Sequence, residues 1–326
     1  VSDTAPQPRM KGPVTRGEDR VDWDRIVGNR FSSLRQVEKP EDWQSYRYPF
    51  IYGQADPSLF DHANWRLCAL QALGQRDFNA MTSDYFQRDD PKLVEFIARH
   101  SLPRRGILAA PDEILVTLGA QNALWIAAEV LLSKERTAVI ESPCYPGQSS
   151  VLRETGCRVV PIEVDQDGLP PEEIPDGADV VFTTPSHHCP TSVTMPLSRR
   201  RDLLERASRD DFIVVEDDYE FEMSMLQPPS PALKSLDREG RVVHVGSFSK
   251  SLFPGLRLGY LVGPAAFIRE ARALRSLLLR HPPGHVQRTA AYFMSLGHYD
   301  ALIKRTAKAF AKRRNVMAEA IQKAGL

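Results

Sequence analysis

A single lysine, Lys250, occupies a short loop between two apolar segments of this 326-residue chain. Residues 242–245 are mostly β-branched, and a second apolar run follows Arg257. This pattern predicts a strand, a tight loop and a second strand, with the lysine amine in the loop. Because burial disfavours the charged ammonium, an amine in this position is suited to attack an aldehyde.

The residues around Lys250 could also hold an anion. Ser247 and Ser249 supply hydroxyl donors, and Arg257 supplies a positive charge a few residues further on. A lysine that forms a Schiff base beside a phosphate site is what pyridoxal phosphate requires. The alternative interpretation is that Lys250 only caps the edge of a sheet with its ammonium in water. The short Ser-x-Ser-Lys motif does not by itself decide between the two.

Polar or aromatic residues also follow the other predicted strands. In a parallel sheet the carboxyl ends of the strands meet at one edge, where ligands bind. Residues 119–121 (Gly-Ala-Gln) open a helix, and a helix N-terminus favours a phosphate. Tyr145 could stack on a flat ring. Asp217 could pair with a pyridinium nitrogen, and Tyr219 could donate to a neighbouring oxyanion.

Each of these residues also has a simpler interpretation. Gly119 could only begin a helix, and Tyr145 could be a half-buried core aromatic. Of Asp217 and Asp218, one is expected to cap a helix or turn, whereas a functional role is expected for at least one. Residues 187–189 (His-His-Cys) lack further ligands at suitable spacing, so no metal site is predicted.

Apolar strand-like segments alternate with helical ones from residue 111 onward. Strands are predicted at 114–117, 138–141, 158–162, 180–184, 212–216, 242–246 and 259–263. Helices are predicted at 122–132, 147–155, 198–208, 264–280, 286–296 and from about 299. The arginines at 199–201 are expected on the solvent face of their helix. The alternation predicts an α/β fold with a mostly parallel, seven-stranded sheet sandwiched by helices.

The composition argues against several classes of function. The chain has 42 Lys and Arg against 42 Asp and Glu, so it lacks the overall positive field that attracts nucleic acid or anionic membranes. Its four cysteines are scattered, which is typical of reduced thiols in a cytoplasmic protein. No apolar stretch reaches the length that spans a membrane. The chain is therefore predicted to be cytoplasmic.

Two other enzyme classes are disfavoured by missing motifs. Residues 247–250 fit the S-x-x-K motif of serine acyl-enzymes, but the S-D-N and K-T-G companions are absent from the sequence. No G-x-G-x-x-G follows a predicted strand, which argues against a Rossmann dehydrogenase.

Several motifs resemble those of a known family. They are VFTTPSHHCPTSVTMPLSRRRDLL, IVVEDDYEFE, ALKSLD, VVHVGSFSKSLFPGLRLGYLV, LGAQNAL, ESPCYPG and KRTAKAFAKRR. They resemble the aminotransferase class I, fold type I, pyridoxal-phosphate proteins. More narrowly, they are similar to the aminotransferase-like domains of the MocR/GabR group of GntR-type bacterial transcription regulators. The similarity runs from about residue 50 to the end and is most specific over 181–264.

The resemblance implies a role for each matching residue. Lys250 would hold the cofactor as an internal aldimine and shuttle a proton. Asp217 would lie on the pyridine nitrogen, Tyr219 would bond the phenolic oxygen, and Tyr145 would stack on the ring. The residues that would hold the phosphate are Gly119 or Ala120, Gln121, Ser247, Ser249 and Arg257.

The sequence departs from the aminotransferase pattern in three ways. Cys189 stands where aminotransferases carry the asparagine of an Asn-Pro-Thr-Gly loop, and the regulators also lose that asparagine. The arginine that clamps a substrate carboxylate in this fold would lie beyond Leu326. No winged-helix domain opens the sequence. We therefore expect the chain to be a fragment.

The expected organisation is an N-terminal linker or arm over 1–48, a large cofactor-binding domain over 49–285, and an interdomain helix with the start of an incomplete small domain over 286–326. The favoured function is the effector-sensing domain of a MocR/GabR-type regulator, in which an amino acid or amine replaces Lys250 on the cofactor. The alternative is a free-standing amino acid:2-oxo acid aminotransferase. The resemblance implies a homodimer, with DNA bound only through a winged-helix domain absent from this chain.

Overall fold

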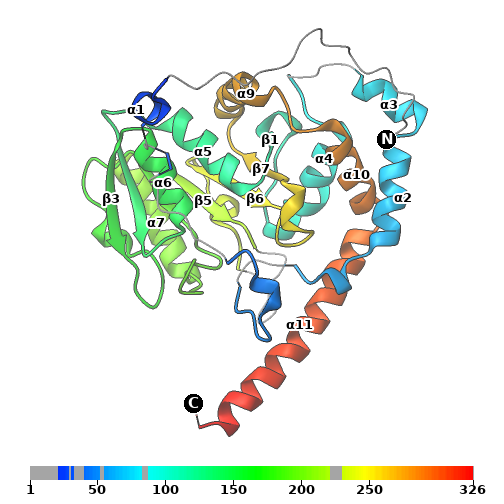
Figure 1. Cartoon of the computed structure of the whole chain (residues 1–326). Coiled ribbons are helices and arrows are strands. Elements are labelled where there is room, and N and C mark those ends of the chain that lie inside the picture. The colour runs from blue at the N-terminus through cyan, green and yellow to red at the C-terminus, as the bar shows by residue number, and fades with distance from the viewer. Residues whose placement is uncertain are drawn as a thin grey trace. The chain divides into compact units, whose positions relative to one another are not determined.

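Seven strands form one sheet at the centre of the computed structural model, which describes residues 21–28, 31–32, 40–51, 55–82, 87–220 and 230–325. The strands are β1 (Ile114–Thr117), β2 (Thr137–Ser142), β3 (Arg158–Glu163), β4 (Val180–Thr183), β5 (Ile213–Asp218), β6 (Val242–Ser247) and β7 (Gly259–Val262). Their order across the sheet is β1-β7-β6-β5-β4-β2-β3 (Figure 1). β7 runs antiparallel to both of its neighbours, β1 and β6, and the other neighbouring strands pair in parallel. The predicted mostly parallel, seven-stranded sheet is therefore confirmed.

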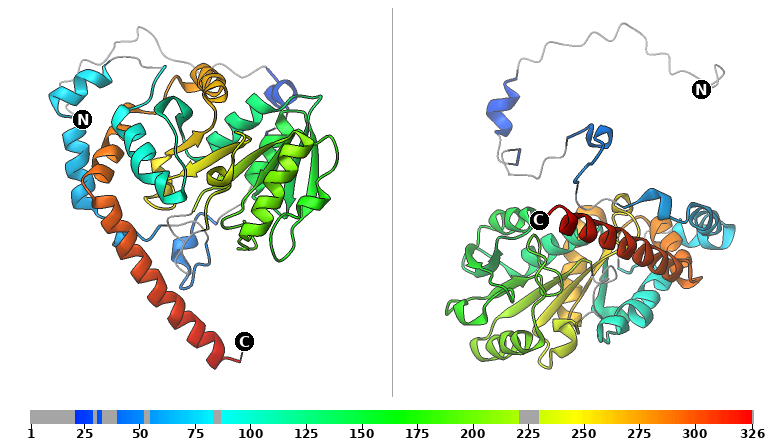
Figure 2. Two further views of the ribbon diagram at one scale, coloured as in Figure 1. Left: turned by 180° about the vertical axis from the view of Figure 1, so that it is seen from behind. Right: turned by 90° about the horizontal axis from the view of Figure 1, so that it is seen from below.

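Alternate residues of the central strands pack into different helical layers. Val139, Val181 and Val214 belong to the same core cluster as residues of α7 (Leu197–Asp210) and α8 (Leu233–Leu236). Ile140 and Phe182 instead join the cluster formed with α5 (Ala120–Leu131), α6 (Pro146–Glu154) and α9 (Ala265–Leu279). Figures 1 and 2 show the sheet between these helices. Because both faces are covered, residues on both faces are apolar over most of each central strand, up to the polar residues at the carboxyl ends of β2 and β5.

Five further α-helices in the described part of residues 37–326 lie before β1 or after α9 in the chain. They are α2 (His62–Ala72), α3 (Gln75–Met81), α4 (Pro91–Phe96), α10 (Gly284–Ser295) and α11 (His298–Lys323). Residues of α2, α4, α10 and α11 share a third core cluster with β1 and β7. Burial of this shared apolar surface holds the N-terminal helices against the end of the sheet.

An aromatic group in the third cluster anchors the segment that follows Lys250. Phe253 makes edge contacts with Phe60 and Trp65, with ring centroids 5.1 and 5.2 Å apart. Phe293 of α10 stacks on Phe60 at 5.8 Å. These contacts fix the loop between β6 and β7 to elements that are nearly 200 residues away in the sequence.

Contacts divide the chain into two compact units, residues 1–36 and 37–326. The described part of the first unit contains α1 (Trp23–Val27), whose residues are all exposed. Its N-cap Asp22 accepts a hydrogen bond from the backbone of Arg25 at 3.1 Å. The domain boundaries predicted at 48 and 285 stay predictions.

α11 starts in the core and ends in solvent. Tyr299 and Leu302 in its first turns are buried, whereas Met317 and Ile321 are exposed. Figure 1 shows the second half of this helix extending beyond the sheet and its covering helices. None of the described helices is both long and apolar enough to cross a membrane.

The prediction that residues 199–201 all face solvent is wrong for Arg200. Its side chain is fully buried and donates to the carbonyl oxygens of Met195 (2.9 Å), Pro231 (2.8 Å) and Pro185 (2.7 Å). Since buried polar groups are normally hydrogen-bonded, the guanidinium is accommodated as a link between three segments. The triple-arginine motif carried no sign of which residue points inward.

Candidate cofactor site

Lys250 lies in the loop after β6, at the edge of the sheet where the parallel strands end. Its Nζ is 5.9 Å from the centre of the Tyr219 ring, which follows the carboxyl end of β5. Both residues are half-buried. The fold therefore brings together the predicted amine and phenol, because β5 and β6 are adjacent parallel strands.

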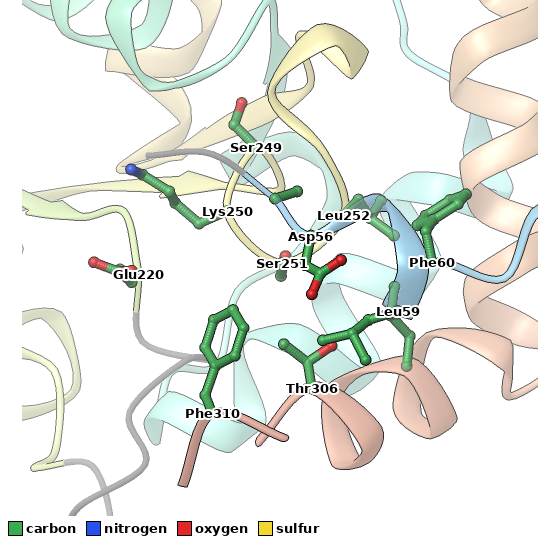
Figure 3. Close-up of a pocket in the computed structure, with 12 residues that line it drawn as sticks. Asp56, Leu59, Phe60, Glu220, Ser249, Lys250, Ser251, Leu252, Thr306 and Phe310 are labelled. Atoms are coloured by element: carbon green, nitrogen blue, oxygen red, sulfur yellow. The ribbon is translucent and has the colours of Figure 1, made fainter. Parts of the chain in front are cut away.

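Lys250 also lines a cavity of about 220 Å³. Figure 3 shows Asp56, Thr306 and Phe310 on the opposite side of this cavity from Lys250. Asp56 is bound to Arg313 of α11, with Nη2 and Oδ2 2.5 Å apart. The wall formed by residues 55–60 and α11 was not predicted, because these side chains come from the two ends of the chain.

The end of β5 carries three consecutive buried carboxylates, Glu216, Asp217 and Asp218. Glu216 accepts hydrogen bonds from the backbone amides of residues 233 and 234 and contacts His244 Nδ1 at 3.0 Å. Asp218 pairs with Arg105, with Oδ2 and Nε 2.6 Å apart. Asp217 Oδ1 has no hydrogen-bond partner among the described residues.

Asp217 and Asp218 each have an oxygen without a hydrogen-bond partner among the described residues, but Asp218 is already paired with Arg105, which leaves Asp217 available to a cationic ligand group. Burial raises its pKa to about 7, and the neighbouring carboxylates Asp218, Glu141 and Glu216 add to this effect. A cation placed beside Asp217 would favour its charged form again. The residue pattern alone left open the choice between Asp217 and Asp218, whereas the resemblance implied Asp217; the partner that Asp218 already has agrees with that prediction.

Gly119 and Arg257, two of the residues predicted to hold a phosphate, meet at the start of α5. Gly119 is the N-cap of α5 with a φ of +84°, and Arg257 Nη2 donates to the carbonyl oxygen of Leu118 at 3.1 Å. A Cβ at Gly119 would lie 3.1 Å from Arg257 Nη2. A Cβ at Gly259 would lie 2.7 Å from the carbonyl oxygen of Gly246 and 2.9 Å from Gly119 Cα. Glycines therefore allow β6, β7, Arg257 and the helix N-terminus to come this close.

Ser247 at the end of β6 pairs with Gly259, whose added Cβ would lie against Gly119 at this helix start. Ser247 Oγ accepts a hydrogen bond from the backbone amide of Ser249 at 3.2 Å. Ser249 Oγ is buried and lacks a hydrogen-bond partner among the described residues. Ala120 is the first residue of α5, so its amide is one of the donors that the helix itself leaves unused.

Tyr145 and Gln121 lie next to each other between α5 and α6. Tyr145 is the N-cap of α6, and a Cβ added at Gly147 would collide with both the Tyr145 ring and Gln121 Oε1. Gln121 Nε2 donates to the carbonyl oxygen of Gly147 at 3.3 Å, while Oε1 has no partner among the described residues.

Burial raises the pKa of the Tyr219 phenol, so that side chain remains a hydrogen-bond donor at neutral pH.

These residues fit pyridoxal phosphate. Asp217 Oδ1 and Ser249 Oγ are buried polar atoms without a partner among the described residues, and such atoms are uncommon in folded proteins. The start of α5 with Arg257 offers the amides and positive charge that a phosphate needs. Lys250 supplies an amine nearby. The structure thus combines an anion for a ring nitrogen, donors for a phosphate and an amine for an aldehyde.

Two polar residues of this region were missed as site residues by the sequence analysis. Glu141 at the end of β2 is buried, accepts from Thr183 Oγ1 at 2.6 Å and from the Thr184 amide at 3.0 Å, and lies 3.4 Å from His188 Nε2. Its position at the end of an apolar run was a signal in the sequence that could have identified Glu141 as a site residue. Arg105 lies in a 3-10 turn far upstream, and its sequence context gave no signal.

A comparison with protein families matches residues 61–326 to the model described as aminotransferase class I and II. Among curated proteins, the HTH-type transcriptional regulator TauR of Rhodobacter capsulatus is 57% identical over the whole of this chain, which spans 67% of TauR. The probable rhizopine catabolism regulatory protein MocR of Rhizobium meliloti is 34% identical over 87% of this chain, which spans 58% of MocR.

Solved structures show the same architecture. A kynurenine aminotransferase of Pyrococcus horikoshii matches 92% of this chain and 78% of its own, with a TM-score of 0.82 and 28% identity. The alpha-aminoadipate aminotransferase LysN of Thermus thermophilus, complexed with N-(5'-phosphopyridoxyl)-L-leucine, matches with a TM-score of 0.81 and 23% identity over 93% of this chain and 78% of LysN. Both similarities extend over nearly the entire described chain.

Proposed function

The chain belongs to the aminotransferase class I and II family, and from this premise we propose that it is the effector-sensing part of a MocR/GabR-type transcriptional regulator. Its cofactor is pyridoxal phosphate. The observation that carries the regulator proposal is the 57% identity to TauR over the full length of the chain. Cys189, which replaces the asparagine of the aminotransferase loop, also favours a regulator over an aminotransferase.

Pyridoxal phosphate supplies an aldehyde that reacts with amines and a ring that withdraws electrons when its nitrogen is protonated. Lys250 would be the amine that engages this aldehyde in the resting protein. Asp217 would balance the positive charge of the ring nitrogen, Tyr219 would donate to the ring oxygen, and Tyr145 would pack on the ring. The residues that would hold the phosphate are Gly119, Ala120, Gln121, Ser247, Ser249 and Arg257.

The effector in this proposal is an amino acid or amine that enters through the cavity beside Lys250. When not bonded to the cofactor, the Lys250 amine would be able to hold a proton near the reacting carbon of the effector. The cavity wall formed by residues 55–60 and α11 would then contact the effector. Binding would thereby act on elements drawn from both ends of the chain.

The second candidate function is that of a free-standing amino acid:2-oxo acid aminotransferase. Several of the solved structures that match this chain carry aminotransferase names, which favours this alternative at the level of the fold. The chain spans about 58 to 67% of the two regulators described above. DNA binding through a winged-helix domain, a homodimeric assembly and a cytoplasmic location are therefore proposals about the whole protein.

Absorbance spectroscopy tests the proposal. The protein is mixed with pyridoxal phosphate, and its spectrum is compared with those of Lys250→Ala and of Lys134→Ala, which replaces an exposed lysine between α5 and β2. We expect a band near the visible edge in the parent and in Lys134→Ala, and its loss in Lys250→Ala. A folded Lys250→Ala protein with an unchanged band would refute the assignment of the lysine.

Addition of amino acids and amines, with a 2-oxo acid as acceptor, separates the two candidate functions. A shift of the band with one amine and no oxo-acid product over many turnovers supports a sensor. Sustained formation of product would instead make the protein an aminotransferase.

A further inference from the structure

Arg105 is a buried cation at the carboxyl edge of the sheet, close to the candidate cofactor site. Its side chain is 1% exposed. Nε lies 2.6 Å from Asp218 Oδ2, Nη2 donates to Ser186 Oγ at 2.8 Å, and Nη1 donates to the carbonyl oxygen of Ser230. The guanidinium therefore joins the end of β5 to the loop after β4 and to the segment before α8.

The position of Arg105 matters because Asp218 directly follows Asp217. Both carboxylates are buried, and the charge of Asp218 is the largest electrostatic contribution to the raised pKa of Asp217 after burial itself. Nearby like charges disfavour ionisation, particularly where little water is present to screen them. An unpaired Asp218 would therefore oppose the charged form of Asp217 that a protonated ring nitrogen needs.

The other neighbouring carboxylates have hydrogen bonds that do not involve Arg105, although the Arg105 charge also helps to lower the pKa of Glu216. Glu216 is hydrogen-bonded to His244 and to the start of α8. Glu141 is hydrogen-bonded to Thr183 and to the amide of residue 184. Asp218 has its charged partner in Arg105, and its second oxygen has no hydrogen-bond partner among the described residues.

We propose that Arg105 is a positioning residue of the cofactor site: by neutralising Asp218, it leaves Asp217 as the anion that faces the ring nitrogen. This inference rests on the proposed function, since it assumes that the cofactor ring lies against Asp217. Arg105 does not touch the cofactor itself. Its effect passes through the Asp218 charge, and its bond to Ser186 holds the loop that leads to Cys189.

A charge-rescue experiment tests the proposal. The variants are Arg105→Gln, Asp218→Asn and the double variant, and the measurement is the affinity for pyridoxal phosphate from titration of the absorbance band. We expect Arg105→Gln to weaken binding by about tenfold or more, because it leaves a buried charge without its partner. Asp218→Asn should bind within roughly threefold of the parent, and the double variant should recover most of the affinity lost in Arg105→Gln.

The 1-deaza analogue of pyridoxal phosphate, which lacks the ring nitrogen, separates an electrostatic role from a structural one. If Arg105 acts through Asp217 and the nitrogen, Arg105→Gln should weaken binding of pyridoxal phosphate much more than binding of the analogue. Equal losses for both ligands, or a double variant no better than Arg105→Gln, would overturn the proposal.

The controls keep the result interpretable. If Arg105→Gln does not fold, the comparison of Asp218→Asn with the double variant still tests the idea: a large loss in the double variant would refute it, since no Asp218 charge then remains. Absence of a Lys250-dependent band in the parent protein would refute the proposed function rather than the role of Arg105.

Discussion

Replacement of Glu141 by glutamine should stabilise the protein more at pH 8 than at pH 5. The Glu141 side chain is 2% exposed, and burial raises its pKa from the usual 4.5 to about 7, although hydrogen bonds from Thr183 and Thr184 oppose the shift. The folded state therefore holds this proton more tightly than the unfolded state does. Such a carboxyl stabilises the fold at low pH, and this contribution is lost as the pH rises through about 7.

The size of the effect follows from the two pKa values. A tenfold change in an acid constant corresponds to about 1.4 kcal/mol. The difference between the ordinary Glu pKa of 4.5 and the folded-state pKa of about 7 therefore corresponds to roughly 3 kcal/mol. Most of it, about 2 to 3 kcal/mol, is lost between pH 5 and pH 8. Glutamine keeps one oxygen for the Thr184 amide and an NH₂ group for Thr183 Oγ1, but it cannot ionise. The variant therefore escapes the penalty that the parent suffers above neutral pH.

Urea unfolding followed by tryptophan fluorescence at pH 5 and pH 8 measures this difference. The free energy of unfolding of Glu141→Gln minus that of the parent should be more positive at pH 8 by about 2 to 3 kcal/mol. Glu129→Gln, at an exposed position of α5, is the control and should show the same difference at both pH values. An equal difference at both pH values for Glu141→Gln as well would refute the reasoning.

Two further predictions concern residues whose roles only the packing shows. Gly259→Ala should destabilise the fold by about 1 to 3 kcal/mol and weaken cofactor binding, because its Cβ would meet backbone atoms of Gly119 and the neighbouring strand within 3 Å. Gly255→Ala, whose Cβ would meet only one atom at 4.0 Å, should be close to neutral in the same thermal and cofactor titrations. Arg200→Met should cost about 3 kcal/mol or more in urea unfolding, since it removes a buried charge-assisted link to three carbonyl oxygens. Arg201→Met, on the exposed face of the same helix, should change stability by less than about 0.5 kcal/mol, and equal costs for the two arginines would contradict the structural assignment.

Much of the architecture was readable from the sequence because its signals are local. Each strand of the parallel sheet is a short apolar run bounded by a polar or glycine residue, and all seven predicted strands are present. The resemblance to class I aminotransferases, which is confirmed, adds residue roles to that pattern. Lys250, Asp217 and Tyr219 could be named in advance because each lies at or shortly after the end of a recognisable strand. Their roles at the cofactor stay predictions.

The tertiary structure decided what depends on partners far away in the chain. Whether Asp217 or Asp218 is available to a ligand depends on Arg105, more than 100 residues upstream, which pairs with Asp218. Whether Arg200 faces solvent or the core depends on carbonyl groups of other segments. Alternation and helical spacing say which residues share a face, but a charge is stable in the interior only where another segment brings a partner. The sequence therefore determined the strand ends at which the chemistry lies, and the fold determined which of the charges there are already paired.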